Sequence, residues 1–379
     1  MVACASLLAG VVVGGGGGQL VTGTLIPTPY CAGSEPAGAS TPETRETREQ
    51  LERAAGQGIV VRMEDRATPE LVRAAGRGTI GGVVLFPPEG TAPAQLAIEL
   101  AKLRRAALLG GVPAPIASID QEGGIVKRLP ALAPRTSPYE IGQGDDRSAA
   151  RREGSATGAD LAELGIDVNL APVLDVPSSE SQFMAPRAFG ASREQVARLG
   201  VAFATAMQRR GVAATAKHFP GLGRAPLNTD FSPTSVAGSR AALRADLRPF
   251  VHAIDAGVRL VMVSSAVYPS LGSDMPAVLS PEIATGLLRD RLGFRGVSIS
   301  DDLLAPALGY QGPGAAAQAG IAAKSAGMDL LLFARRDVGN VAAALARAAR
   351  ADRLDAQVLV DSCERIVELK GQVAATARP

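Results

Sequence analysis

The feature that most constrains this chain is an alternation of short apolar runs with longer amphipathic segments, repeated eight times. The intervening segments have helical spacing, as in 93–109, 192–210 and 239–256. Continuous apolar runs bounded by turn residues are typical of strands buried on both faces of a parallel sheet. The eight predicted strands are 58–62, 80–86, 116–119, 168–176, 212–216, 260–263, 297–300 and 330–333.

Eight successive strand and helix units predict an α/β fold, a single (β/α)8 TIM-type barrel. A doubly wound open sheet is the alternative, but that fold favours a glycine-rich phosphate loop after its first strand. The first strand here leads into residues 63–66, which contain no glycine. Residues 334–379 follow the last strand, enough for two or three helices but not for a second β-domain.

Composition narrows the classes of function. The 379-residue chain is 46% hydrophobic and has a formal net charge of +2 at pH 7. It can therefore bury a large core, and it lacks the basic excess typical of nucleic-acid-binding proteins. Three cysteines and two histidines do not suggest a disulfide scaffold or a structural zinc site. We expect no metal, no organic cofactor and no nucleic-acid partner.

The beginning of the chain has a different character. Residues 1–19 hold an apolar run followed by five consecutive glycines, and the apolar run is about the length of a signal-peptide core but too short to span a bilayer. Residues 20–46, rich in Thr, Pro, Ser and Gly, predict a linker before a barrel domain over 47–375. The pattern favours an exported protein with no stable membrane span, and a cytoplasmic protein is the alternative. Cys31 and Cys363 could pair outside the cell.

In a barrel the chemistry lies at the carboxyl ends of the strands, and three of these ends carry polar residues. The third strand ends at Asp120, before Gln-Glu-Gly-Gly, and the fifth ends at Lys217 and His218, before Phe-Pro-Gly. The seventh ends at the acidic pair Asp301 and Asp302. One of this pair could cap the next helix while the other acts as a carboxylate nucleophile. Turns and helix caps are the structural alternative for each acidic residue.

These motifs, in this order, make residues 48–345 similar to the β-N-acetylhexosaminidases of glycoside hydrolase family 3. Segment 120–124 with Arg128, and segment 217–221, resemble the sugar-binding segments of that family. Arg187, in Pro-Arg-Ala-Phe-Gly, matches a further sugar-contacting arginine. Asp301, in Ser-Asp-Asp-Leu, stands in the nucleophile position.

The resemblance implies an exo-acting, retaining glycosidase that removes a terminal β-linked N-acetylhexosamine from a small saccharide or muropeptide derived from the cell wall or chitin. Asp301 would form a covalent glycosyl-Asp intermediate, and an acid would protonate the leaving oxygen. Aromatic residues make up only 3% of the chain, which favours one small terminal sugar as the ligand. Charge-assisted hydrogen bonds would hold that sugar. The residues that would form them are Asp120, Arg128, Arg187, Lys217 and His218.

The chain departs from that family in the loop after the fifth strand. Family members carry an Asp-Ser-His triplet there, whose His is the acid/base, and the corresponding residues here are Asn228, Thr229 and Asp230. Asp230 is therefore the candidate acid/base, in a role that requires burial or the nearby charge of Asp301. A surface ion pair between Asp230 and Arg224 is the structural alternative.

Three hypotheses follow for the function. Asp230 replaces the missing histidine, or the enzyme is slow and depends on activated leaving groups, or the chain is a catalytically impaired, envelope-associated sugar-binding protein on the same barrel. The loss of general acid/base catalysis typically costs about 10²–10⁴ in rate, so weak activity could persist. His252 lies in a predicted helix and is interpreted as structural.

Overall fold

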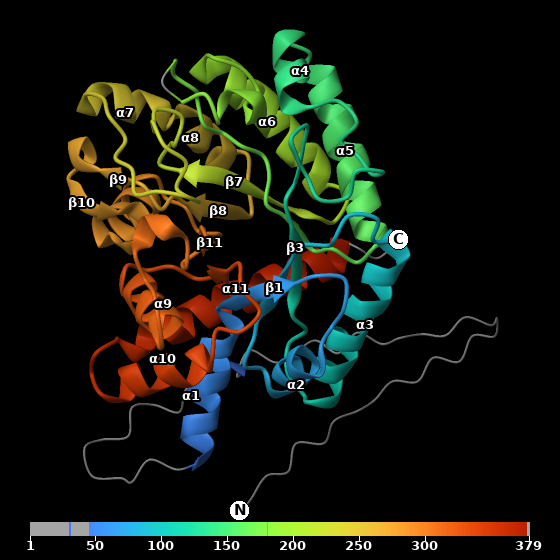
Figure 1. Ribbon diagram of the computed structural model, residues 1–379, viewed down its shortest axis with the longest axis vertical. Coiled ribbons are helices and arrows are strands. Elements are labelled where there is room, and N and C mark those ends of the chain that lie inside the picture. The colour runs from blue at the N-terminus through green and yellow to red at the C-terminus, as the bar shows by residue number, and fades with distance from the viewer. Residues whose placement is uncertain (1–29, 32–44, 180, 377–379) are drawn as a thin grey trace, which may run out of the picture.

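The computed structural model describes residues 30–31, 45–179 and 181–376. Eight parallel strands form one sheet in the order β11, β8, β7, β6, β3, β2, β1, β12. The two end strands, β11 (Val297–Ser300) and β12 (Leu331–Phe333), are joined by a parallel bridge between Ile299 and Leu330. The sheet therefore closes on itself, which confirms the predicted (β/α)8 barrel (Figure 1).

Most strands lie where the apolar runs predict them. β3 (Ile116–Ile119), β8 (Leu260–Val263) and β11 have the predicted bounds. β1 (Ile59–Met63), β2 (Gly82–Leu85) and β12 differ from the prediction by a few residues at their ends. Every residue of β2, β3, β8 and β11 is buried, as expected for strands that are covered on both faces.

The fourth and fifth predicted strands change length in opposite directions. β6 (Val168–Asn169) is much shorter than the predicted run of 168–176. Pro172 has no backbone N–H to donate to a strand ladder, so the regular ladder ends at β6, and single hydrogen bonds and a bridge between Val173 and Lys217 continue the contact with β7. β7 (Ala213–Phe219) extends past its predicted end at residue 216. The longer β7 therefore carries Lys217 and His218 on a strand.

Helices cover the outside of the barrel between the strands. Their bounds are α2 (Pro69–Arg77), α3 (Pro93–Leu109), α4 (Pro138–Gln143), α5 (Arg147–Glu163), η2 (Ala185–Arg187), α6 (Arg193–Gln208), α7 (Arg240–Asp246), α8 (Arg248–Asp255), η5 (Glu282–Arg291), η6 (Pro306–Leu308), α9 (Ala315–Ser325) and α10 (Val341–Arg350). The helix predicted over 239–256 is in fact two, because α7 and α8 meet at Leu247. Pro249, in the first turn of α8, would lose a hydrogen bond inside one continuous helix.

Two short hairpins extend the loops at the barrel mouth. β4 (Gln121–Gly123) pairs with β5 (Val126–Lys127) directly after β3. β9 (Val267–Tyr268) pairs with β10 (Ser273–Pro276) after β8, and the short helices η3 (Pro269–Leu271) and η4 (Ala277–Leu279) lie in the same loop. The first hairpin begins immediately after Asp120, so it helps to build the wall of the site.

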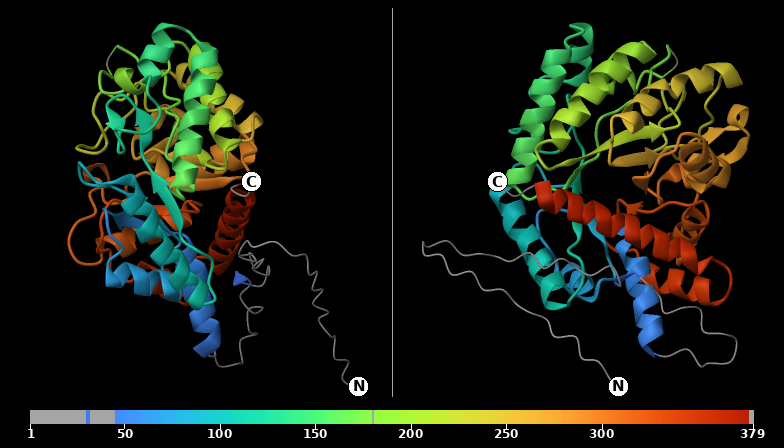
Figure 2. Two further views of the ribbon diagram at one scale, coloured as in Figure 1. Left: turned by 90° about the vertical axis from the view of Figure 1, so that its right-hand side faces the viewer. Right: turned by 180° about the vertical axis from the view of Figure 1, so that it is seen from behind.

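The opposite end of the barrel is closed by α11 (Ala356–Thr376) (Figure 2). Ile366, Leu369 and Val373 of this helix belong to one buried apolar cluster with the first residues of β3, β6, β8 and β11. α1 (Arg45–Gln57) packs against α10 and α11. The interior at the amino ends of the strands is therefore filled by apolar side chains, and the carboxyl ends are left for the site.

The predicted export segment, residues 1–19, lies outside the described residues, and so does nearly all of the predicted linker over 20–46. Within the part of the chain that is described, no helix combines the length and the apolar character needed to cross a bilayer.

Candidate functional site

A cavity of about 300 Å³, here called the catalytic cavity, opens at the carboxyl ends of the strands. The structure brings together all seven residues that the sequence proposed for the site, because each of them lines this cavity: Asp120, Arg128, Arg187, Lys217, His218, Asp230 and Asp301. They come from the ends of β3, β7 and β11, from η2 and from the loops that follow β5 and β7. Their chemical roles stay predictions.

One side of the catalytic cavity is a buried network of ion pairs. Lys217, which is 2% exposed, places its Nζ 2.8 Å from Asp120 Oδ1 and 2.6 Å from Glu122 Oε1. Arg187 donates from Nε and Nη2 to both oxygens of Glu122, at 2.9 and 2.7 Å. The four residues form a continuous chain of alternating charges, which we call the paired side.

The network determines the charge state of its members. Burial raises the pKa of Glu122, but Lys217 and Arg187 outweigh burial and hold that pKa at about 2. Burial lowers the pKa of Lys217, yet Asp120 and Glu122 outweigh it and keep the pKa above its usual value. Glu122 likewise raises the pKa of Arg187 against the effect of burial. These three groups therefore stay ionised across the neutral pH range.

Arg128 stands at the edge of the paired side. Its guanidinium lies 4.4 Å from the centroid of the Phe86 ring and 3.9 Å from the carboxylate of Asp120. Arg62 approaches the same ring at 4.8 Å. Stacking on an aromatic face holds a guanidinium plane in place while its edge remains available for hydrogen bonds.

His218 is oriented by a carboxylate that the sequence analysis missed. Its Nδ1 lies 2.7 Å from Oδ2 of Asp175, and both side chains are buried. Asp175 also accepts hydrogen bonds from the backbone N–H groups of His218 and Leu222. A carboxylate at Nδ1 makes that nitrogen the donor and fixes the plane of the ring.

The other side of the catalytic cavity holds Asp301 and Asp230, and among the described residues neither carboxylate forms an ion pair with a lysine or an arginine. We call it the reacting side. Asp301 follows β11 directly, and its Oδ1 accepts a hydrogen bond of 2.9 Å from the N–H of Asp302. Burial is the main cause that raises the pKa of Asp301 to about 6; His218 opposes the rise, and the charge of Asp230 adds to it. Asp301 is therefore a carboxylate whose ionisation falls close to neutral pH.

The next helices, η6 and α9, have Ala305 and Gly314 at their caps, so the helix cap suggested for one member of the acidic pair is not formed. Asp302 has a different structural role. Its Oδ1 accepts hydrogen bonds from the N–H of Leu304 at 3.1 Å and from the N–H of Ala334 at 3.0 Å. The carboxylate thus ties the loop after β11 to the loop after β12. Asp301 is the member of the pair that remains for chemistry.

The loop that carries Asp230 corrects one expectation. Arg224 does not pair with Asp230; its Nε donates to Asp246 at 2.6 Å, and Arg193 contacts the same carboxylate. The N–H of Asp230 donates to Oδ1 of Asn228 at 3.0 Å, and Nδ2 of Asn228 lies 3.3 Å from Oδ2 of Asp230. The two side chains form a local turn beside the catalytic cavity. The surface ion pair was a wrong alternative.

Three further residues complete the comparison with the sequence. Glu122 lies in the predicted sugar-binding segment 120–124 but was not predicted as a site residue. It accepts hydrogen bonds from both Lys217 and Arg187. Asp175 was not predicted, and the signal that could have found it is an acidic residue inside a mostly apolar run, 168–176. His252 lies on the exposed surface of α8, within a helix as expected, and does not line the catalytic cavity.

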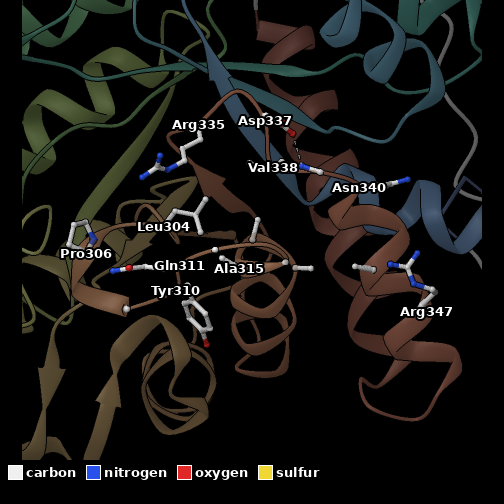
Figure 3. A pocket seen from close by; sticks show the side chains of 17 residues that line it. Leu304, Pro306, Tyr310, Gln311, Ala315, Arg335, Asp337, Val338, Asn340 and Arg347 are labelled. Atoms are coloured by element: carbon white, nitrogen blue, oxygen red, sulfur yellow. Dashed lines mark hydrogen bonds between the residues drawn. The ribbon is translucent and has the colours of Figure 1, made fainter.

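A second and larger cavity, of about 700 Å³, lies between the loops after β11 and β12 (Figure 3). We call it the neighbouring cavity. Its walls include residues of η6, the first turn of α9 and the start of α10. Nothing in the sequence motifs predicted it.

Comparison with known proteins identifies the family. The family model described as the glycosyl hydrolase family 3 N terminal domain matches residues 45–369. An uncharacterized secreted glycosyl hydrolase of Arthroderma benhamiae is 36% identical over 337 residues, covering 85% of this chain and 93% of the relative. A beta-hexosaminidase of Methylobacillus flagellatus is 32% identical over 274 residues, covering 70% of this chain and 76% of the relative.

A solved structure agrees with these relatives. The glycoside hydrolase family 3 beta-N-acetylglucosaminidase of Paenibacillus sp. str. FPU-7 matches with a TM-score of 0.81 at 31% identity. The match covers 87% of this chain and 64% of that one, so the chain spans less than two thirds of that structure. This protein belongs to glycosyl hydrolase family 3, and within that family it is a β-hexosaminidase-like glycosidase. The resemblance drawn from the motifs is thereby confirmed.

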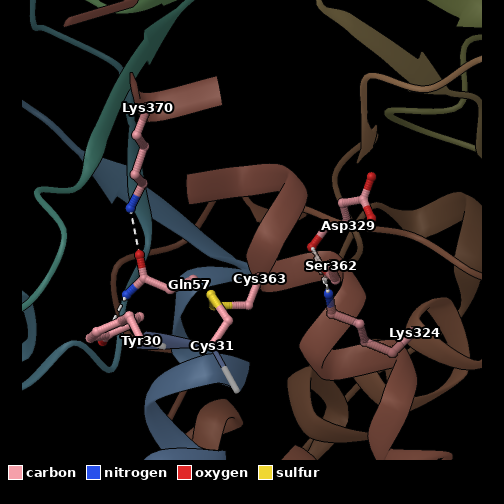
Figure 4. The surroundings of a disulfide bond; sticks show 8 residues. All are labelled: Tyr30, Cys31, Gln57, Lys324, Asp329, Ser362, Cys363 and Lys370. Atoms are coloured by element: carbon pink, nitrogen blue, oxygen red, sulfur yellow. Dashed lines mark hydrogen bonds between the residues drawn. A yellow bond between two sulfur atoms is a disulfide. The ribbon is translucent and has the colours of Figure 1, made fainter. Parts of the chain in front are cut away.

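A disulfide bears on where the protein acts. Cys31 and Cys363 are bonded, with their Cα atoms 5.7 Å apart, and the bond attaches residue 31 to α11 (Figure 4). Disulfides form and persist in oxidising compartments. Together with the secreted relative from Arthroderma benhamiae, the disulfide supports export, in agreement with the sequence.

Proposed function

We propose that this protein is an exo-acting, retaining β-N-acetylhexosaminidase that works outside the cytoplasm on cell-wall or chitin-derived saccharides. The observation that carries the proposal is Asp301, which follows β11 and shares the catalytic cavity with Asp230. The cavity volume of about 300 Å³ lies at the lower end of small-molecule pockets. That size favours one terminal sugar over a long stretch of polymer.

The paired side would bind the sugar with the donors that its ion pairs leave unused. An ammonium has three N–H donors, and Lys217 uses two of them on Asp120 and Glu122. Arg187 uses Nε and Nη2 on Glu122, so its Nη1 group is left over. Arg128 and His218 add donors from the rim and from β7. Because the network is already ordered, binding would cost little side-chain entropy.

The reacting side would supply the covalent chemistry. Ionised Asp301 attacks the anomeric carbon, and the leaving oxygen departs with a proton from Asp230. The resulting ester removes the negative charge of Asp301. Asp230, now ionised, takes a proton from water, and the hydroxide character of that water displaces the sugar from Asp301. The charges of Asp230 and Asp302 both raise the pKa of Asp301, and Asp302 is bound to the backbone of two loops, which supports the assignment of this role to Asp230.

Hydrolysis of an aryl N-acetyl-β-glucosaminide tests the proposal. We expect turnover by the unmodified protein and a loss of about 10⁴-fold or more for Asp301→Ala, because no other group replaces a missing nucleophile. Asp274→Ala is the matched control, since Asp274 is exposed on β10 and does not line the catalytic cavity. Activity of the unmodified protein no higher than that of Asp301→Ala would contradict the proposal.

The predicted replacement of the family's Asp-Ser-His triplet by Asn228, Thr229 and Asp230 favours one second candidate, a sugar-binding protein with impaired turnover. In that case the paired side would still bind N-acetylglucosamine. Calorimetry with the free sugar, run beside the aryl substrate assay, separates the two functions. Binding without turnover supports the second candidate, and the absence of binding eliminates it.

A further inference from the structure

The outward face of α3 carries several large apolar side chains that remain in water. Leu108 and Leu109, at the end of the helix, are 70% and 78% exposed, and Ile98 is 56% exposed. Residues three and four apart share one face of a helix, so Arg105 lies on the same face as the two leucines. Adjacent exposed apolar side chains of this size typically mark a surface that contacts another apolar body.

Arginines accompany these leucines. Arg77 is the last residue of α2, and Figure 1 shows α2 beside α3. The two helix ends are in contact, because the carbonyl of Gly76 leaves no room for a side chain on Gly110. Arg77 and Arg105 are both exposed, and among the described residues neither side chain has an ion pair or a hydrogen bond. We call Arg77, Arg105, Leu108 and Leu109 the basal patch.

The basal patch lies at the end of the barrel opposite the catalytic cavity. α3 ends at Leu109, before the amino end of β3, whereas the cavity lies at the carboxyl ends of the strands. Tyr30 lies at the same edge, since a Cβ on Gly78, the C-cap of α2, would be 2.8 Å from the Tyr30 hydroxyl oxygen. The apolar run within residues 1–19 precedes Tyr30 in the sequence. The chain therefore enters the described barrel next to the basal patch.

The pairing of leucines with arginines restricts the partner. An anionic polymer would attract the arginines but would make no favourable contact with the leucines. A second copy of this chain, in a symmetric dimer, would bring the arginines of the two patches together, and like charges repel each other. An anionic lipid surface suits both kinds of side chain, because its headgroups attract arginine and its acyl chains accept leucine.

We propose that the basal patch docks this protein on the surface of an anionic lipid bilayer, with Leu108 and Leu109 inserted at the boundary between headgroups and acyl chains. Docking requires no helix that crosses the bilayer. Because the catalytic cavity opens at the opposite end of the barrel, the docked protein holds that cavity away from the lipid, where a saccharide outside the membrane can reach it.

A single tryptophan tests the contact directly, because the chain contains no tryptophan of its own. The full chain with Leu109→Trp is mixed with vesicles of phosphatidylglycerol and phosphatidylcholine. We expect its emission to move to shorter wavelength, since indole fluorescence responds to the loss of water. Met275→Trp is the matched control, because Met275 is 47% exposed on β10 at the mouth of the barrel. No shift for Leu109→Trp, or the same shift in both variants, would overturn the proposal.

Sedimentation with the same vesicles measures what each side chain contributes. Arg77→Gln and Arg105→Gln should each weaken binding about fivefold, as for one basic residue at an anionic membrane surface. The double variant Leu108→Gln, Leu109→Gln should weaken binding about tenfold or more, because it removes the apolar insertion. Arg240→Gln, at the exposed start of α7 near the barrel mouth, should bind like the unmodified chain. Added salt should weaken binding, because ions screen these exposed charges.

The remaining outcomes identify other partners, and each would overturn the proposal. A loss caused by the arginine variants alone would indicate an anionic polymer or free phosphate. Vesicle binding unchanged in every patch variant would place the contact elsewhere in the chain. A dimer in solution that the double leucine variant dissociates would identify a second copy. Turnover of the aryl substrate should be the same in the patch variants as in the unmodified protein, so this test and that of the proposed function succeed or fail separately.

Discussion

The two sides of the catalytic cavity contain the same kinds of side chain in opposite circumstances. On the paired side, Glu122 is buried between Lys217 and Arg187, and its pKa falls to about 2. On the reacting side, Asp301 is also removed from water, the opposing effect of His218 does not outweigh burial, and the pKa of Asp301 rises to about 6. Both carboxylates lose hydration. The pKa falls where cationic partners outweigh the loss of hydration, and it rises where they do not.

This contrast shows how one cavity can both bind a sugar and supply the group that reacts with it. Groups that are held in buried ion pairs keep a fixed charge and a fixed geometry, which suits recognition of hydroxyl groups. A carboxylate that lacks a cationic partner has a higher free energy when it is ionised, which suits a nucleophile that becomes a neutral ester. Substitutions on the two sides should therefore have different consequences.

The largest effect is expected from Asp230→Asn, which removes the proposed acid/base. For a saccharide substrate, kcat/KM should fall by about 10²–10⁴, because the leaving oxygen no longer receives a proton. For a dinitrophenyl N-acetyl-β-glucosaminide, whose leaving group needs no proton, the cleavage step should change much less. Burst kinetics measures that step. An equal loss with both substrates would contradict the role of Asp230, and Asp255→Asn on α8 serves as the exposed control.

Glu122→Gln should have the next largest effect, on stability. The substitution keeps the shape of the side chain but leaves Lys217 and Arg187 without their shared counter-charge. Breaking a buried ion pair in this way typically costs about 3–5 kcal/mol. Chemical denaturation of the variant and of Glu163→Gln, an exposed control at the end of α5, measures the difference. A loss below about 1 kcal/mol would mean that the paired side is not a tightly coupled network.

The smallest effect is expected from Asp301→Asn and concerns stability. In contrast to Glu122→Gln, this substitution should stabilise the fold. The folded-state pKa of about 6 lies above the usual value of 3.8, so the folded state binds this proton more tightly than the unfolded chain does. Ionised Asp301 therefore costs stability above pH 6, and the cost disappears as the pH falls from 6 towards 4. We expect the variant to be more stable by about 1–3 kcal/mol at pH 8 and to lose that advantage near pH 4. Denaturation at both pH values checks it, and a variant less stable at pH 8 would contradict it.

The sequence predicted the barrel because its strands are buried on both faces and therefore appear as continuous apolar runs. It overextended the fourth strand, since the apolar character of 168–176 hides the effect of Pro172 on pairing. It also joined α7 and α8 into one helix, although Pro249 marks the break. In both cases the hydrophobic pattern was right, and a proline changed the hydrogen bonding of the backbone.

The site was predictable where a motif follows a strand end, as with Asp120, Lys217 and Asp301. Glu122 and Asp175 were missed because their partners lie far away in the chain. Glu122 is 65 residues from Arg187, and Asp175 is 43 residues from His218. Only the closed barrel brings such pairs together. The neighbouring cavity was equally beyond prediction, because it depends on how two loops pack beside each other.

The central claim, that Asp301 is the nucleophile of a retaining glycosidase, can be measured directly. A 5-fluoro-N-acetylglucosaminyl fluoride should react quickly at the anomeric carbon and leave a glycosyl ester that hydrolyses slowly. Digestion and mass spectrometry would then locate the sugar. We predict one adduct per chain, on the peptide that contains Asp301, and none on Asp301→Ala. An adduct on another residue, or turnover of the fluoride without any covalent adduct, would contradict the account.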